Sequence, residues 1–109
     1  METNEASELY EVRHETDLTD YKSGQIILKQ GEKTDFACKL LVGTAKVIRE
    51  GDAVMTIKAG EYFGAIAAIT GAKRAATVVA IERCVVENIS NEDFQVMISN
   101  NPDLLDKIY

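Results

Sequence analysis

Short hydrophobic runs rich in valine, isoleucine and threonine alternate with polar turns along most of the chain. Runs of this kind are typical of β-strands. Six of them stand out: Ile26–Leu28, Leu40–Val42, Ala45–Ile48, Ala53–Ile57, Ala76–Ile81 and Cys84–Ile89. The segment Glu50-Gly51-Asp52 predicts a hairpin turn in which Gly51 takes a positive φ. Evenly spaced short strands with glycine turns predict an antiparallel sandwich or barrel.

Two helices are predicted after the last strand. Ser90 is placed to cap the first, and acidic residues fill its first turn, where they are favourable. Phe94 and Met97–Ile98 form an apolar stripe at helical spacing that should dock on the strands. Pro102 lies outside every predicted strand and suits the first turn of a second short helix.

The composition narrows the class of protein. A chain of 109 residues allows one domain, and 46% hydrophobic with 28% charged residues is ordinary for a globular protein. Acidic residues outnumber basic ones by 18 to 12, a formal net charge of -6, which argues against nucleic-acid binding because that needs a basic face. No hydrophobic run approaches the roughly 20 residues of a membrane span, so we expect no membrane partner and a cytoplasmic location.

Residues that commonly carry catalysis or hold metals are sparse. The one histidine, His14, lies in a polar N-terminal stretch, and we predict neither a metal site nor a catalytic set of the Ser/His/Asp or Cys/His type. We therefore expect no enzyme activity. Cys38 and Cys84 lie far apart inside apolar runs, which favours two buried thiols and leaves a disulfide or redox role as the alternative.

Residues 60–78 break the strand pattern. The alanine-rich run 65–69 predicts a short helix that ends at Gly71, and Lys73 and Arg74 then stand together before the next strand. Free amides at a helix start that face a returning arginine form an anion site, because arginine binds a phosphate through two parallel hydrogen bonds. The alternative is a surface turn with two solvated cations.

Two motifs stand in order within this segment: Phe63-Gly64-x-Ile66-Ala67 and Gly71-x-x-Arg74-Ala75-Ala76-Thr77-Val78-x-Ala80. Together they resemble the phosphate-binding cassette of cyclic-nucleotide-binding domains. That family includes the regulatory subunit of cAMP-dependent protein kinase, the catabolite activator protein and nucleotide-gated channels. The resemblance covers about residues 20–108, because it extends to Gly24–Glu32, to Gly43-x-Ala45-x-Val47, and to Phe94 with Asn101–Leu105.

The resemblance implies a mainly β fold, an eight-stranded antiparallel jelly-roll barrel (double-stranded β-helix) with short flanking α-helices. It places this domain at residues 18–109, after an N-terminal segment, residues 1–17, to which no structure is assigned. The family continues into a longer C-terminal helix that closes over the base, and we expect this lid to be truncated or absent here.

The resemblance also implies a ligand and its site. A cyclic phosphate would rest on backbone amides at the start of the short helix and at Ala75 and Ala76, with Arg74 as the counter-charge. Gly64 would let the backbone approach the sugar. The full expected ligand-binding set is Phe63, Gly64, Ala65, Ile66, Ala67, Lys73, Arg74, Ala75 and Ala76.

The chain departs from the family pattern at two positions of the cassette, and a third position bears on the choice of nucleotide. The family has a glutamate that accepts the ribose 2′-hydroxyl where this chain has Ala65, and Glu61 is a nearby carboxylate that could substitute. The usual proline before the arginine is Lys73, which adds a cation beside the phosphate. A threonine or serine after the arginine favours cGMP in this family, so Ala75 favours cAMP.

Three hypotheses follow. The first is a non-catalytic sensor or regulatory module that binds cAMP, or another cyclic nucleotide, without a metal, and acts on a protein partner or as a homodimer. The second is a degenerate cassette that no longer binds nucleotide and serves as a structural or protein-interaction domain. The third is a site for a different phosphorylated or sulfated anion.

Overall fold

The structure, a computed structural model, describes residues 17–107. All but Asp17 of the predicted N-terminal segment, residues 1–17, therefore lies outside the described residues. Within them the chain forms eight strands: β1 (Leu18–Tyr21), β2 (Ile26–Leu28), β3 (Phe36–Val42), β4 (Thr44–Arg49), β5 (Asp52–Lys58), β6 (Tyr62–Phe63), β7 (Thr77–Ala80) and β8 (Cys84–Ser90). Three helical elements accompany them: α2 (Ala65–Thr70), α3 (Asn91–Asn100) and the 3-10 helix η1 (Pro102–Lys107).

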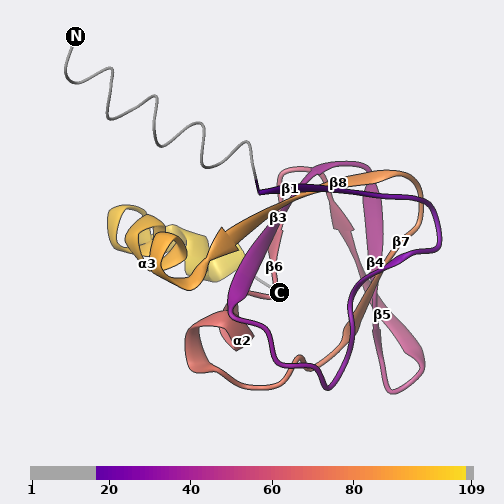
Figure 1. The fold of residues 1–109 in the computed structure, drawn as a ribbon, viewed down its shortest axis with the longest axis horizontal. Coiled ribbons are helices and arrows are strands. Elements are labelled where there is room, and N and C mark those ends of the chain that lie inside the picture. The colour runs from indigo at the N-terminus through magenta and orange to yellow at the C-terminus, as the bar shows by residue number, and fades with distance from the viewer. Residues whose placement is uncertain (1–16, 108–109) are drawn as a thin grey trace, which may run out of the picture.

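The strands form two antiparallel four-stranded sheets. One has the order β1-β8-β3-β6 and the other the order β2-β7-β4-β5. Figure 1 shows the two sheets side by side, with α2 and α3 at the end away from the β4–β5 hairpin. The predicted eight-stranded antiparallel jelly-roll fold is confirmed, although its strands form two separate sheets and do not close into one barrel.

Most predicted elements are confirmed at their expected places. The turn between β4 and β5 has Gly51 at φ 86° and Glu50 at φ 54°, the left-handed conformation that a tight hairpin turn requires. Ser90 caps α3, since its hydroxyl accepts a hydrogen bond from the Asp93 amide at 3.1 Å. The second short helix begins at Pro102, as predicted, but it is a 3-10 helix.

Two hydrophobic clusters hold these elements together. The larger lies between the sheets and includes Leu40, Ile57, Phe63 and Val86, all buried. The smaller packs α2 and α3 against the first sheet, with Phe94 fully buried at its centre. Phe63, just before α2, belongs to the larger cluster, and Ala65, the first residue of α2, belongs to the smaller one. The two clusters together therefore fix the start of α2.

The two cysteines are buried and unpaired, which confirms the thiol interpretation.

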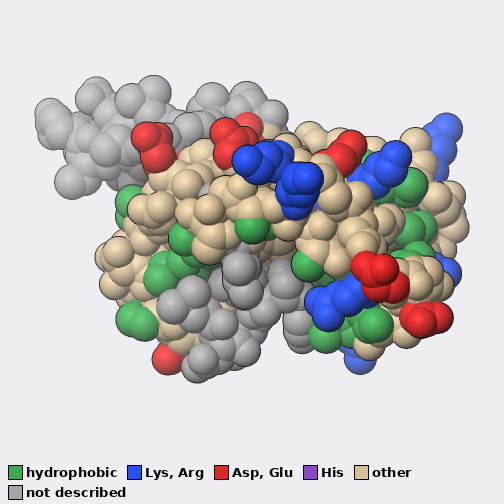
Figure 2. All heavy atoms as spheres, turned by 90° about the horizontal axis from the view of Figure 1, so that it is seen from below, with side chains coloured by type: hydrophobic (Ala, Val, Ile, Leu, Met, Phe, Trp, Pro, Cys, Tyr) green, Lys and Arg blue, Asp and Glu red, His purple; other side chains and the backbone are tan. Residues whose placement is uncertain are grey.

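Figure 2 shows Lys and Arg side chains interspersed with Asp and Glu on one face, so charge of neither sign dominates there. No helix in the described part of the chain has the length and apolar character to cross a membrane.

Candidate functional site

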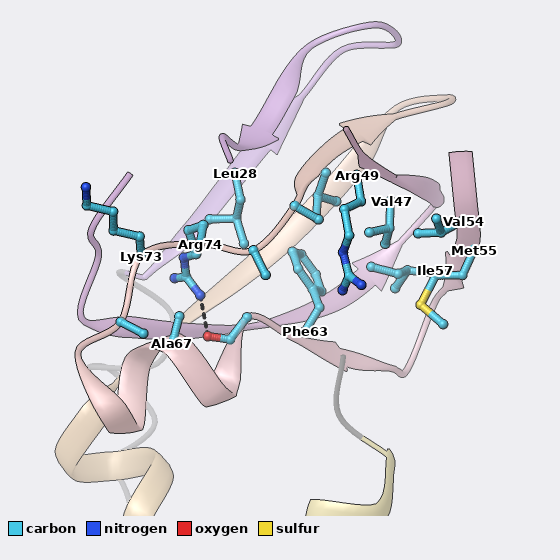
Figure 3. A pocket seen from close by; sticks show the side chains of 15 residues that line it. Leu28, Val47, Arg49, Val54, Met55, Ile57, Phe63, Ala67, Lys73 and Arg74 are labelled. Carbon is cyan, nitrogen blue, oxygen red and sulfur yellow. Dashed lines mark hydrogen bonds between the residues drawn. The ribbon is translucent and has the colours of Figure 1, made fainter. Parts of the chain in front are cut away.

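A cavity of about 500 Å³ opens between the second sheet, the start of α2 and the segment that leads into β7. This volume is in the range of small-molecule sites, roughly 300–1,000 Å³. Its lining is mostly apolar: Leu28, Val47, Arg49, Val54, Met55, Ile57, Phe63, Gly64, Ala67, Ala72, Lys73, Arg74, Ala75, Ala76 and Val78. Figure 3 shows these side chains around the cavity, with Arg74 and Arg49 on opposite sides of Phe63.

Two hydrogen bonds hold the main chain of Arg74 in place. Its amide donates to the Glu32 carbonyl at 2.8 Å, and its carbonyl accepts from the Gly31 amide at 2.9 Å. Both bonds reach the loop after β2, so they hold the segment before β7 against that loop. The Arg74 side chain is consequently directed inward, where only 4% of the residue remains exposed.

The Arg74 guanidinium contacts main-chain oxygens from two different elements. One terminal nitrogen donates to the Gly64 carbonyl, and the other donates to the Phe36 carbonyl at 2.6 Å. The Phe36 ring also lies under the group, 5.6 Å from its central carbon to the ring centroid. Arginine has five N–H donors, and the buried Nε has no hydrogen-bond partner. The group therefore keeps donors for a further acceptor.

The buried charge of Arg74 has no carboxylate partner among the described residues. Burial lowers its pKa, because a charged group loses hydration there. The ionisable group that couples to it is the thiol of Cys38, whose pKa burial raises to about 12 although the Arg74 charge lowers it. At neutral pH that thiol is uncharged, so it supplies no counter-ion.

Gly64 is required at the point where Arg74 meets the main chain. Its φ is 74°, a conformation that strains any residue with a Cβ. A Cβ built there would also lie 2.5 Å from a terminal nitrogen of Arg74 and 3.0 Å from Leu28 Cδ1. Gly64 thus permits both the sharp entry into α2 and the close approach of the guanidinium.

The structure brings most of the predicted ligand-binding residues to one cavity. Seven of the nine line it: Phe63, Gly64, Ala67, Lys73, Arg74, Ala75 and Ala76. Ala65 does not, since its fully buried side chain belongs to the cluster around Phe94. Ile66 lies in the first turn of α2.

Lys73 and Glu61 are the two charged residues expected to add a cation beside the phosphate and to substitute for the family glutamate. Neither contributes a charged group to the cavity. Figure 3 shows the Lys73 side chain directed away from the cavity, whereas Arg74 points into it. Glu61 does not line the cavity; its carboxylate accepts a hydrogen bond from the Lys58 amide at 2.8 Å. The family glutamate that Ala65 replaces therefore has no substitute in Glu61.

Sequence reasoning missed Arg49, at the far end of the cavity from Arg74. Alternation along β4 gives a signal that could have found it, because Arg49 lies two residues beyond Val47 and four beyond Ala45, both buried. The pairing of β4 with β5 has a register irregularity opposite Val54. At such an irregularity the strict alternation of side chains is interrupted, and the consecutive residues Val54 and Met55 both line the cavity. Both remain exposed, at 53% and 38%.

This fold and cavity define a small-ligand-binding β-sandwich of the jelly-roll type. The family model described as "Cyclic nucleotide-binding domain" matches residues 18–101. The chain belongs to this cyclic nucleotide-binding family.

Curated relatives are larger proteins. The chain is 29% identical over 86 residues to a cAMP-dependent protein kinase regulatory subunit of Debaryomyces hansenii, covering 78% of this chain and 19% of the relative. It is 33% identical over 91 residues to a cGMP-dependent protein kinase of Toxoplasma gondii, covering 84% of this chain and 8% of the relative. The chain thus spans about a fifth or less of the length of these relatives.

Solved structures show the same fold. The structure described as "cAMP bound PfPKA-R (141-441)" superposes with a TM-score of 0.75 and 31% identity, over 81% of this chain and 31% of that chain. The catabolite activator protein of Thermus thermophilus gives a TM-score of 0.70 at 22% identity, over 83% of this chain and 45% of that chain.

Proposed function

We propose that this domain is a regulatory sensor module that binds a cyclic nucleotide, cAMP in preference to cGMP, and catalyses no reaction. The observation that carries the proposal is the buried guanidinium of Arg74, which borders an apolar cavity and has an unpartnered Nε. A buried charge without a counter-ion is costly. The singly charged phosphate of a cyclic nucleotide supplies that counter-ion.

We expect the ligand to bind in one direction. Its phosphate lies at Arg74, beside the main chain of Ala75 and Ala76 and the first turn of α2. The lack of a side chain at Gly64 leaves room for the Arg74 guanidinium that the phosphate would contact. The opposite end of the cavity is formed by Val54, Met55 and other apolar side chains together with Arg49. Its apolar surface suits the flat faces of a purine.

Two sequence differences tune this binding. Ala75 carries no hydroxyl, and in this family a hydroxyl at that position favours cGMP, so we expect cAMP to bind more tightly. Without the ribose-binding glutamate at position 65, we expect an affinity roughly ten- to a hundredfold weaker, because a charge-assisted hydrogen bond contributes about 1.5–3 kcal/mol. We therefore expect a dissociation constant in the micromolar to submillimolar range.

The relatives support a place for the module in a larger system. Several are regulatory subunits of a cAMP-dependent protein kinase. We propose that residues 18–109 act as one cytoplasmic domain that passes the binding signal to a protein partner or to a second copy.

One observation favours a second candidate, a degenerate cassette with a structural role. Both terminal nitrogens of Arg74 already donate to carbonyl oxygens of the protein, at Gly64 and Phe36. In that case the guanidinium joins α2 to β3 and binds no ligand.

Calorimetric titration with cAMP and cGMP distinguishes the candidates. The wild type should bind, and Arg74→Ala should lose at least about a hundredfold in affinity, because more than one charge-assisted hydrogen bond is removed. Arg83→Ala is the matched control, since it removes the same charge from an exposed site, and it should bind like the wild type. Arg74→Lys, which keeps the charge but not the planar donor pair, should also bind weakly and guards against a folding defect in the alanine variant.

No heat from either nucleotide with the wild type would favour the degenerate cassette. Heat from inorganic phosphate or sulfate, with none from the nucleotides, would favour a site for a different anion.

A further inference from the structure

Arg49 places a second guanidinium on the cavity, far from the one at Arg74. It is the last residue of β4, where the hairpin to β5 begins, and it lines the cavity. Figure 3 shows its side chain extending from the strand toward Phe63 and Ile57. The residue is exposed, so its guanidinium borders the cavity from the solvent side. Two cations of the same type thus border one apolar space from its two ends.

The carboxylates nearest to Arg49 in the sequence do not neutralise it. Glu50 is engaged elsewhere, since its carboxylate accepts a hydrogen bond from the Gln30 side chain at 2.6 Å. Asp52 is the partner of Arg49 across the hairpin in the strand register, but within the described range no ion pair joins them. The Arg49 guanidinium is therefore free to donate to a ligand.

The surroundings of Arg49 are apolar and partly open. Val54 and Met55 are more than a third exposed, while Ile57 and Phe63 are buried below them. These side chains offer surface for a flat ring but no hydrogen-bonding groups. Arg49 is consequently the polar group positioned to contact the edge of a ring at this end.

We propose that Arg49 reads the base of the bound nucleotide and strengthens the binding of guanine relative to adenine. This inference rests on the proposed function, because a phosphate at Arg74 places the base at the opposite end of the cavity. Guanine presents two adjacent acceptors, N7 and O6, which match the planar donor pair of arginine. Adenine presents N7 beside an amino donor, which faces the guanidinium donor to donor.

Arg49 and Ala75 thus act on different atoms of the ligand and in opposite directions. Ala75 withholds a contact that favours cGMP at the phosphate end, and Arg49 supplies one at the base end. The preference for cAMP is therefore narrower than Ala75 alone implies.

The test measures the affinity ratio of cGMP to cAMP by calorimetry. Arg49→Gln should weaken cGMP about tenfold and change cAMP by less than about twofold, because one bidentate contact is lost. Arg49→Lys keeps the charge without the paired donors and should shift the ratio equally. Lys46→Gln is the matched control: it removes a positive charge from an exposed position on the same strand that does not line the cavity, and it should leave the ratio unchanged.

A nucleotide analogue sharpens the assignment. The wild type should bind 7-deaza-cGMP, which lacks the N7 acceptor, several-fold more weakly than cGMP, and Arg49→Gln should bind the two alike. Equal losses for cAMP and cGMP, or an unchanged ratio in Arg49→Gln, would overturn the base-reading role while leaving the proposed function intact. A wild type that binds neither nucleotide would instead overturn the proposed function, and this inference with it.

Discussion

Arg74 and Arg83 stand nine residues apart on either side of β7, yet their environments are opposite. Arg83 lies on the surface beside Asp20, donating from Nε to one carboxylate oxygen at 3.1 Å and from a terminal nitrogen to the other at 2.6 Å. The side chains of Arg83 and Asp20 are 64% and 56% exposed. Arg74 is almost completely buried, and its two hydrogen bonds end on main-chain carbonyls.

The contrast is the one expected between a surface charge and a charge that binds a ligand. Where a charge is cheap, at the surface, the chain supplies the counter-ion itself, and the pair contributes little to stability. Where a charge is costly, in the interior, the described part of the chain supplies carbonyl dipoles but no anion. A buried, incompletely paired cation on a cavity is the arrangement expected of a binding group whose partner comes from outside.

The largest expected effect comes from giving Arg74 an anion of its own. Ala67 lines the cavity, and Figure 3 shows it at the Arg74 end. Ala67→Glu should lower cAMP affinity by about a hundredfold or more in calorimetry, because the new carboxylate occupies the guanidinium and repels the phosphate. Ala67→Gln is the matched neutral control and should bind at least tenfold more tightly than Ala67→Glu. Equal binding by the two variants would show that the phosphate does not depend on Arg74.

A smaller effect concerns the thiol of Cys38, the ionisable group that is coupled to Arg74. Burial raises its pKa to about 12, whereas an unfolded chain has a cysteine pKa of about 8.5. The folded state therefore holds the proton more tightly. The contribution of this proton to the free energy of unfolding is complete below pH 8.5. It is lost as the pH rises toward 12, at up to about 1.4 kcal/mol per pH unit. Urea unfolding of the wild type between pH 8 and 11 should show this slope.

Cys38→Ala provides the comparison for that slope. Its stability should fall less steeply over the same range, since the group that titrates is gone. Identical slopes in the two proteins would mean that the thiolate is accommodated beside Arg74, which would make the buried cation internally paired at high pH.

Much of this fold was predictable because its signals are local. The hairpin turn at Gly51 and the capping of α3 by Ser90 depend on residues adjacent in the sequence. The strand β1 was missed because it is four residues long, half exposed and paired only with β8, so its existence depends on tertiary pairing. Strand β6, with two residues, depends in the same way on β3.

The site was predictable to the extent that the motif carries it. Arg74 and Gly64 were found because their spacing resembles a known cassette, and both line the cavity. Arg49 belongs to no such motif, and its role depends on which face of β4 meets a cavity that distant segments complete. The burial of Ala65 in the Phe94 cluster was likewise invisible, because it depends on where α3 packs.

The smallest expected effect is at the surface pair itself. The hydrogen bond and charge of Asp20 raise the pKa of Arg83, but the guanidinium is charged at any ordinary pH with or without its partner. Asp20→Asn should therefore change the melting temperature by less than about 4 °C, and high salt should shrink the difference further, because water and ions compete for exposed charges. Nucleotide affinity should be unchanged, since neither residue borders the cavity. Thermal melts at low and high salt, with the Asp20→Asn/Arg83→Gln double variant beside the single one, check this. A salt-independent fall of 10 °C or more would mean that the exposed pair stabilises the β1–β8 edge as strongly as a buried contact does.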